Sequence, residues 1–269
     1  MVRGGEVIDT HIHLLPGIDD GAGSMEVARE MIARAREVGF RTLVATPHLR
    51  DPLAPANRQR VEEALAEVQA VAAAAGIEVR LGYEIMLGPH LPARLANGEA
   101  VTMAGSRAVL VEVPFSAWPH YAEQTLFALQ LDGYRPVLAH PERYLAVQQD
   151  PTRAIEMAAR GIVLQVTIGS LVGLFGRAGR QTAETLILSG AAQLVATDAH
   201  SAGRRFTTAV EGLHRLRELI GEERAAQLTD GVPRALLADA PLPELAPLPK
   251  RRADHRLGAF GRLLGRRRD

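Results

Sequence analysis

Short apolar segments rich in β-branched residues recur along the chain and alternate with longer segments in which apolar residues return every three or four positions. Short segments of this kind are typical of buried strands, and the longer ones are typical of amphipathic helices. The predicted strands cover residues 7–10, 41–45, 78–82, 108–113, 135–139, 162–166 and 193–196. The predicted helices cover residues 24–38, with Ser24 as N-cap, and residues 57–75, 121–131 and 178–189, with Gly76, Gly133 and Gly190 as stops.

The alternation of strands and helices predicts an α/β fold built on a parallel sheet. The order of strands and helices along the chain allows either a distorted (β/α)7 TIM-like barrel or an open, doubly wound sheet. Polar residues at the carboxyl ends of the strands favour the barrel, which is predicted to occupy residues 1–240.

The composition changes beyond the barrel. Residues 241–249, PLPELAPLP, are predicted to form a linker, because Pro at this density prevents a regular helix. Residues 250–269 are strongly basic and carry Leu257, Phe260, Leu263 and Leu264 at helical spacing. This tail is either an amphipathic helix that touches anionic lipid or an acidic partner, or a disordered solubilising segment.

The charge balance and the amino-acid composition exclude several classes of function. The 31 basic and 31 acidic residues give no net field that would attract nucleic acid to the body of the protein. The chain contains no Cys, which excludes disulfides, thiolate catalysis and Cys-ligated metals. It shows neither a signal peptide nor a long apolar span, so we expect a cytoplasmic protein, with the basic tail as the candidate contact to the inner membrane.

Imidazole and carboxylate groups stand at the end of nearly every predicted strand. His11 and His13 leave the first strand on one face, where both can bind the same ion. The later strands end at His48, Glu84, Glu112, His140, Asp198 and His200. Two strand-end histidines alone could be satisfied structurally, but a whole series of buried polar groups is costly without cations. Ligands of this kind suit Mn²⁺, Fe²⁺ or Zn²⁺, and their number allows two or three ions.

The sequence alone allows two roles for each of two further aspartates. Asp20 lies in a loop shaped by Gly and Pro, where it is either a further ligand or an ordinary turn or cap residue. Asp9 either supports the metal ligands from behind or caps its strand. Thr46 and Ser201 lie near ligands without a Ser-His-Asp pattern and are expected to orient loops.

Arginines follow two of the strand-end ligands. Arg143 comes after His140, and Arg204 and Arg205 come after His200. A guanidinium group binds phosphate oxygens bidentately, so Arg143 and Arg205, the latter favoured over Arg204, are expected to bind a phosphoryl group. Water activated by the metal ions would then be the nucleophile, and no protein nucleophile is required.

The motifs at these positions resemble the polymerase and histidinol phosphatase (PHP) superfamily, and within it the bacterial protein-tyrosine phosphatases of capsule and exopolysaccharide clusters. The motifs are DTHIH at 9–13, LPGIDDG at 15–21, ATPH at 45–48, AHPERY at 139–144 and TDAH at 197–200. The resemblance runs from about residue 7 to 239 and excludes the tail.

The resemblance implies a distorted seven-stranded barrel, a trinuclear and often manganese-containing site, and hydrolysis of phosphotyrosine on a bacterial tyrosine kinase that controls polysaccharide export. It also implies the ligands, which are His11, His13, Asp20, His48, Glu84, Glu112, His140, Asp198 and His200. The rim at 51–60 matches no pattern that predicts a substrate.

Two rival classes of function stay open on sequence alone, another enzyme and a non-catalytic scaffold. A PHP phosphatase for a small molecule such as histidinol phosphate would use the same metals, because the metals do not select the leaving group. A metal-stabilised scaffold without catalysis is disfavoured because every ligand type is present. A nuclease would need a basic groove that this balanced composition does not indicate.

Overall fold

The computed structural model describes residues 7–48, 55–98 and 100–249. The strands are β1 (Val7–Ile12), β2 (Phe40–Ala45), β3 (Glu78–Leu81), β4 (Glu84–Met86), β5 (Ala108–Glu112), β6 (Arg135–Ala139), β7 (Val163–Thr167) and β8 (Ala192–Ala196). The α-helices are α1 (Met25–Val38), α2 (Pro55–Ala74), α3 (Leu91–Ala96), α4 (Ala122–Leu131), α5 (Leu145–Gln149), α6 (Thr152–Ala159), α7 (Gly176–Leu188), α8 (Arg204–Ile220), α9 (Glu222–Ala226) and α10 (Val232–Leu237). The single-turn helices are η1 (Met103–Gly105), η2 (Pro141–Arg143), η3 (Ile168–Val172) and η4 (Gln227–Gly231).

The strands form two parallel sheets, β1-β2-β3 and β4-β5-β6-β7-β8, which together make a distorted β/α barrel. Isolated bridges join the sheets at both seams, Ile12 with Ala199 and His48 with Glu84. The predicted α/β barrel is thereby confirmed. All seven predicted strands are present. A further short strand that was not predicted, β4, follows the third one, and β3 pairs with β2 while β4 pairs with β5.

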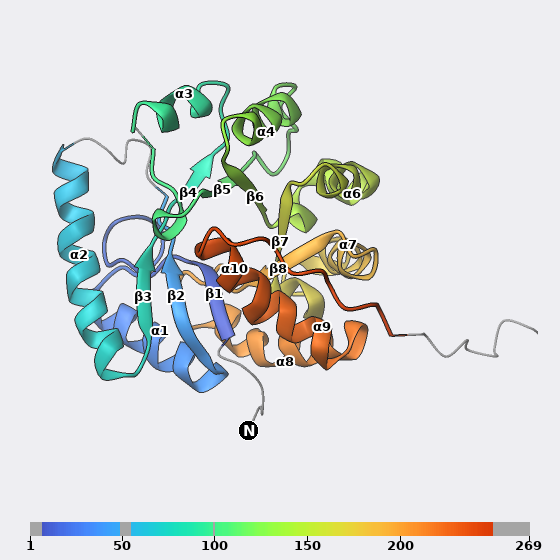
Figure 1. Ribbon diagram of the computed structural model, residues 1–269. Coiled ribbons are helices and arrows are strands. Elements are labelled where there is room, and N and C mark those ends of the chain that lie inside the picture. The colour runs from blue at the N-terminus through green and yellow to red at the C-terminus, as the bar shows by residue number, and fades with distance from the viewer. Residues whose placement is uncertain (1–6, 49–54, 99, 250–269) are drawn as a thin grey trace, which may run out of the picture.

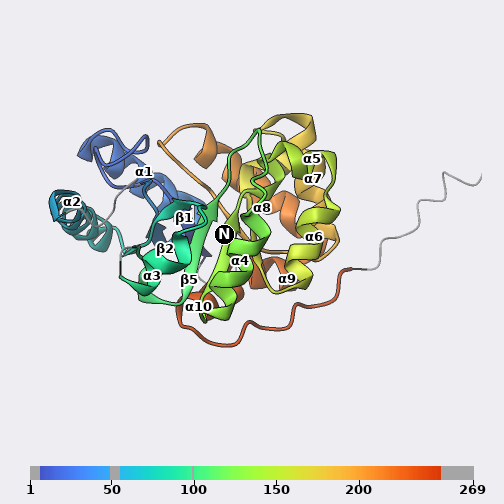
Figure 2. The same cartoon turned by 90° about the horizontal axis from the view of Figure 1, so that it is seen from above.

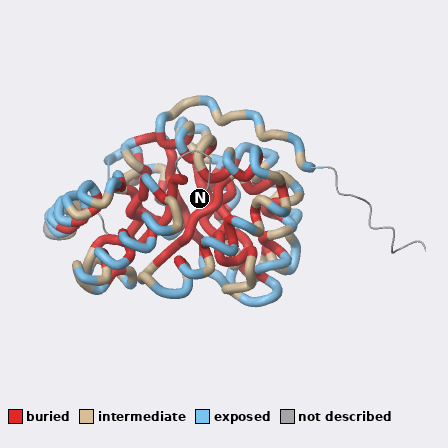
Figure 3. Tube along the Cα trace, turned by 90° about the horizontal axis from the view of Figure 1, so that it is seen from below, coloured by how far each residue is buried: buried red, intermediate tan, exposed pale blue. Residues whose placement is uncertain are grey.

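The helices lie around the strands, as Figures 1 and 2 show. Alternate strand residues such as Leu43, Val109 and Leu164 face outward and pack against the helices. The other set, including Leu110 and Leu194, fills the barrel interior together with Val232, Leu236 and Leu237 of α10. In Figure 3 the buried residues accordingly follow the strands, while the outer faces of the helices are exposed. No helix in the described part of the chain is long and apolar enough to cross a membrane.

The predicted helices are present, with their ends close to the expected positions. Ser24 caps α1 by accepting a hydrogen bond from the Val27 amide at 3.4 Å, and Gly39 ends it in the left-handed region at φ 112°. Helix α8 was not predicted, although its buried residues recur every three or four positions. The spacing of these apolar residues could have predicted the helix.

Residues 240–249, most of which were expected to be a linker, follow the surface of the barrel without helix or strand (Figure 2). Three of its side chains pack against the hydrophobic core, namely Leu242, Leu245 and Leu248. Arg224 donates to the Ala246 carbonyl at 2.8 Å, and the Gln227 side chain accepts from the Ala246 amide at 2.7 Å. The segment is therefore attached to α9 and η4. The basic tail at 250–269 lies outside the described residues.

Ending the chain after Ala240 is expected to lower the melting temperature by roughly 5 °C, because three half-buried leucines contribute about 2 kcal/mol to the free energy of unfolding. A chain that ends after Pro249 keeps the attached segment, loses only residues 250–269, and serves as the control. Calorimetry of both truncated proteins measures the difference. Equal melting temperatures would show that the segment adds nothing to the fold.

Candidate metal centre

Four buried ligand groups meet at the carboxyl end of the barrel: His11, His13, Glu84 and Asp198. The Nε2 atom of His11 lies 2.9 Å from Glu84 Oε2 and 3.4 Å from Asp198 Oδ1. The Nε2 atom of His13 lies 3.3 Å and 3.5 Å from the same two oxygens. Imidazole nitrogens and carboxylate oxygens that converge in this way can hold one divalent cation.

Glu84, the first residue of β4, also belongs to a second group, with His48 and Glu112. Its Oε2 lies 3.5 Å from His48 Nε2, and its Oε1 lies 2.7 Å from His140 Nε2. His48 Nδ1 in turn lies 3.4 Å from an oxygen of Glu112, the last residue of β5. Glu84 is therefore placed to share its two oxygens between adjacent cations.

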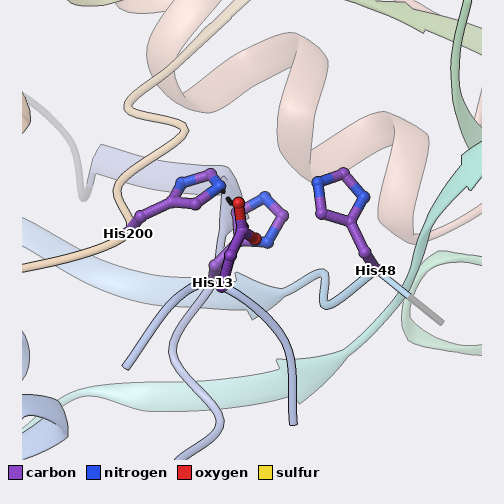
Figure 4. Close-up of side chains that lie close together, drawn as sticks. His13, His48 and His200 are labelled. Carbon is purple, nitrogen blue, oxygen red and sulfur yellow. Dashed lines mark ion pairs between the residues drawn. The ribbon is translucent and has the colours of Figure 1, made fainter. Parts of the chain in front are cut away.

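A third group combines His13, His48, His200 and Asp20 at the more open side of the centre. Figure 4 shows how the three imidazoles gather from separate segments of the chain. Asp20 is 70% exposed, and its Oδ1 lies 3.4 Å from His200 Nε2. The loop does fold back over the first strand, since the Ala22 amide donates to the His13 carbonyl at 3.0 Å. A Cβ at Gly21 would lie 2.2 Å from that carbonyl oxygen, so only Gly fits there.

Two of the turns that aim these ligands have unfavourable backbone angles. His140 follows β6 at φ 35°, and Asp198 follows β8 at φ 51°. Left-handed angles at residues other than Gly cost of order 1–3 kcal/mol and cluster at functional sites. Here they turn an imidazole and a carboxylate inward from the strand ends.

Groups behind the ligands orient them, and sequence analysis missed two of these groups. Asp19 Oδ2 lies 2.6 Å from His13 Nδ1 and accepts from the His48 amide at 2.9 Å. Gln165 Oε1 lies 2.8 Å from His11 Nδ1. Both contacts place the ring proton on Nδ1 and leave Nε2 free to bind an ion. A glutamine in the middle of the buried strand β7 was the available signal for Gln165.

Asp9 and Glu142 are buried carboxylates outside the three groups. Asp9 accepts a hydrogen bond from the Thr197 amide at 3.0 Å and so ties β1 to the loop that carries Asp198. Burial raises the pKa of Asp9 to about 6. Glu142 accepts from the Thr167 amide at 3.0 Å and from the Ser170 hydroxyl at 2.6 Å. Both residues support the loops that carry the ligands.

The electrostatics of the centre favour cations. Burial opposes ionisation of Glu84 and Asp198, but neighbouring imidazoles, and Arg205 for Asp198, hold the pKa of both carboxyls well below the usual range. Burial opposes protonation of His13, yet its contacts with Asp19 and other carboxylates raise its pKa well above the usual value. Ionised carboxylates that hold protons on neighbouring imidazoles can bind divalent cations in place of those protons.

The pKa values of Glu112 and His200, at the edge of the centre, shift in the opposite directions, up for the carboxyl and down for the imidazole. Burial and repulsion from Glu84 raise the pKa of Glu112 to about 7. Burial and the nearby His13 lower the pKa of His200 to about 4, which keeps this imidazole neutral and able to bind a metal. The donor set as a whole, imidazole and carboxylate without thiolate, fits Mn²⁺, Fe²⁺ or Zn²⁺.

Two arginines lie beside the centre. Arg143 Nη1 lies 2.6 Å from Asp198 Oδ2, and Arg205 Nη1 lies 2.9 Å from Asp198 Oδ1. Arg205 also contacts His200. Arg204 is exposed at the start of α8. The structure thus brings Arg205 to the centre and leaves Arg204 at the surface.

The chain matches a known family over most of its length. The family described as capsular polysaccharide synthesis, CpsB/CapC, matches residues 7–238. The chain belongs to the CpsB/CapC family. The tyrosine-protein phosphatase YwqE of Bacillus subtilis is 33% identical over 226 residues, which cover 83% of this chain and 89% of YwqE. The tyrosine-protein phosphatase CpsB of Streptococcus pneumoniae is 25% identical over 240 residues, 87% of this chain and 99% of CpsB.

A solved structure supports the same assignment. It comes from crystal structures of YwqE from Bacillus subtilis and CpsB from Streptococcus pneumoniae, described as unique metal-dependent tyrosine phosphatases. It superposes with a TM-score of 0.81 at 32% identity and covers 91% of this chain and 100% of its own. The resemblance to PHP-type capsule phosphatases inferred from the motifs is thereby confirmed.

A cavity of about 660 Å³ opens beside the centre of this CpsB/CapC protein. Its lining includes the ligand groups Asp20, His48, Glu84 and Glu112. Ile85, Met86 and Arg94 form another part of its wall, and Met86 is 51% exposed. The cavity is large enough to admit a side chain that carries a phosphoryl group to the ligands.

Replacing Asp19 by Asn is expected to weaken Mn²⁺ binding by roughly 10- to 100-fold, because the imidazole of His13 loses the carboxylate that fixes its tautomer. Titration of the metal-free protein with Mn²⁺ measures the affinity. Asp132→Asn, at the exposed C-cap of α4, is the control and should bind Mn²⁺ as the unmodified protein does. Unchanged affinity in Asp19→Asn would mean that this contact does not orient His13 for metal.

Proposed function

We propose that this protein is a metal-dependent protein-tyrosine phosphatase, a phosphoric monoester hydrolase that acts on phosphotyrosine. The observation that carries the proposal is the convergence of strand-end imidazoles and carboxylates, with Glu84 at their centre, beside two arginines. The names of the family relatives YwqE and CpsB support the same activity. The alignment with this chain covers most of the length of both relatives.

Nine side chains are the proposed metal ligands: His11, His13, Asp20, His48, Glu84, Glu112, His140, Asp198 and His200. Eight of them make up the three overlapping groups, and His140 lies beside Glu84. The groups support two or three ions, because Glu84, His13 and His48 each belong to two of them. Mn²⁺ is the foremost candidate, and Fe²⁺ or Zn²⁺ would accept the same donors. When bound, such ions lower the pKa of water and neutralise charge on a phosphoryl group.

The chain itself contributes binding and orientation. Arg143 and Arg205 are the proposed phosphate-binding groups, since each carries several N–H donors and only some of them face Asp198. The hydroxyl groups near the ligands are engaged with backbone: Thr46 accepts from the Ile12 amide at 3.1 Å, and Ser201 accepts from the Gly203 amide at 3.3 Å. Water is therefore the proposed nucleophile.

The proposed substrate is a phosphotyrosine protein, and more specifically a bacterial tyrosine kinase that regulates capsule or exopolysaccharide synthesis in the cytoplasm. The link of the family to capsular polysaccharide synthesis supports this partner. The open cavity beside His48 and Glu112 supports a substrate that reaches inward on an extended side chain.

The decisive experiment is an assay of metal-depleted protein with and without Mn²⁺ on three substrates. These are a phosphotyrosine peptide, a phosphoserine peptide and histidinol phosphate, each also tested with His140→Ala. We expect Mn²⁺-dependent phosphate release from phosphotyrosine that is lost in the variant. Preference for histidinol phosphate would replace the proposal with a small-molecule phosphatase, and no turnover of any substrate would indicate a scaffold.

A further inference from the structure

Arg143 lies between two aromatic rings at the rim of the metal centre. Its guanidinium carbon is 4.5 Å from the ring centre of Phe115 and 4.3 Å from that of Phe175. These distances lie within the range of cation–π attraction, about 6 Å, and Arg stacks well on such rings. The guanidinium of Arg205 lies 5.5 Å from the ring of Phe175, so this phenylalanine contacts both proposed phosphate-binding arginines.

The ring of Phe115 is held in place although 43% of the residue is exposed. The backbone carbonyl of Phe115 accepts a hydrogen bond from the Leu145 amide at 2.9 Å. The ring lies 5.4 Å from that of His140 and 5.8 Å from that of Tyr144. The buried Tyr144 hydroxyl accepts from the Val113 amide at 3.1 Å, which fixes the start of the same loop. Phe115 is therefore held by its backbone and by its ring contacts although it is partly exposed.

Phe175 reaches Arg143 from a different loop, between η3 and α7. Gly173 at φ 85° and Gly176 at φ 84° flank it, and both have left-handed angles that favour Gly. The tight turn that they form presents the phenylalanine to the site. Three loops, after β5, β6 and β7, thus converge on one guanidinium group.

We propose that Phe115 and Phe175 are positioning residues that clamp Arg143 in the orientation that binds phosphate. Contact with the two rings holds the guanidinium group from two loops, and its N–H groups can still donate hydrogen bonds. One edge donates to Asp198 at 2.6 Å, which aims the remaining donors along the rim of the centre. The clamp restricts a flexible side chain before phosphate arrives, and this lowers the entropy lost on binding. The inference rests on the proposed phosphate-binding role of Arg143.

The test is a double-mutant cycle read by calorimetric binding of inorganic phosphate to the manganese-loaded protein. Phe175→Leu is expected to weaken phosphate binding about tenfold, which corresponds to about 1.4 kcal/mol. Phe115→Leu should act in the same direction, while Phe175→Tyr should restore most of the affinity because it keeps the ring. In an Arg143→Ala background, Phe115→Leu should cause no further loss, and Phe175→Leu should cause only the smaller loss that comes from its contact with Arg205.

Phe127→Leu is the matched control, since Phe127 is 57% exposed on α4 and should leave phosphate affinity unchanged. Manganese content, measured for every variant, reports whether the ligands themselves are intact. An equal loss from Phe175→Leu with and without Arg143, or no loss in either, would overturn the clamp. Phosphate binding does not depend on the leaving group, so lack of phosphotyrosine turnover with an intact cycle would reject only the proposed function.

Discussion

Glu84→Gln is expected to lower Mn²⁺-dependent turnover of a phosphotyrosine peptide by roughly a thousandfold or more. Glu84 is the carboxylate that lies near four imidazoles, those of His11, His13, His48 and His140. Loss of its charge removes the group that two adjacent cations would share. Metal ions lower the activation free energy by several kcal/mol, and about 1.4 kcal/mol corresponds to a tenfold change in rate. The measurement is kcat/KM together with manganese content per chain.

The control for this variant is Glu78→Gln, at an exposed glutamate of the neighbouring strand β3. It should retain both turnover and metal content, which separates loss of a site carboxylate from loss of charge in general. Turnover in Glu84→Gln within tenfold of the unmodified protein would rule out Glu84 as a shared ligand. Circular dichroism of both proteins would show whether the fold is retained.

Arg143→Ala is expected to lower kcat/KM for the same peptide by roughly 100- to 1000-fold with manganese content unchanged. The reason is that a preoriented donor to the transferring phosphoryl group is lost while the proposed metal ligands all remain. Arg205→Ala should show a loss of similar size, because Arg205 lies at the other oxygen of Asp198. Steady-state kinetics on the manganese-loaded variants measure these losses.

Arg204→Ala supplies a closely matched control, since Arg204 precedes Arg205 in sequence and is exposed. It should change kcat/KM by less than about twofold, as expected for a solvated surface arginine. A loss in Arg204→Ala as large as that in Arg205→Ala would contradict the assignment of the second phosphate-binding arginine. A fall in manganese content in Arg143→Ala would show that the residue acts on the metal site instead.

The step from β3 in one sheet to β4 in the other explains why Glu84 can occupy the centre. β3 ends at Leu81 on the side of β2, and β4 begins at Glu84 on the side of β5. The shift from one sheet to the other places Glu84 next to His48, to which it is joined by an isolated bridge. The irregularity of the barrel therefore contributes directly to the shape of the site.

Much of the site could be expected from the sequence, because position along a parallel strand implies position in space. Strand-end residues such as His11, His48 and His140 were predicted to gather, since the carboxyl ends of all strands lie at one end of a barrel. The same argument does not reach residues whose function depends on loop conformation. Asp19 and Asp20 are adjacent and chemically identical, yet one is buried against His13 and the other is largely exposed beside His200.

By itself the sequence determined the α/β class, the succession of strands along the chain, the candidate ligand residues and the absence of thiolate chemistry, because these depend on local periodicity and composition. Only the tertiary structure decided the step from β3 to the additional strand β4, the contact of His11 with Gln165, and the contacts of Phe115 and Phe175 with Arg143. Each of these joins groups from separate strands or loops, 154 positions apart for His11 and Gln165. Contacts of that kind are set by packing across the barrel, which local sequence does not encode.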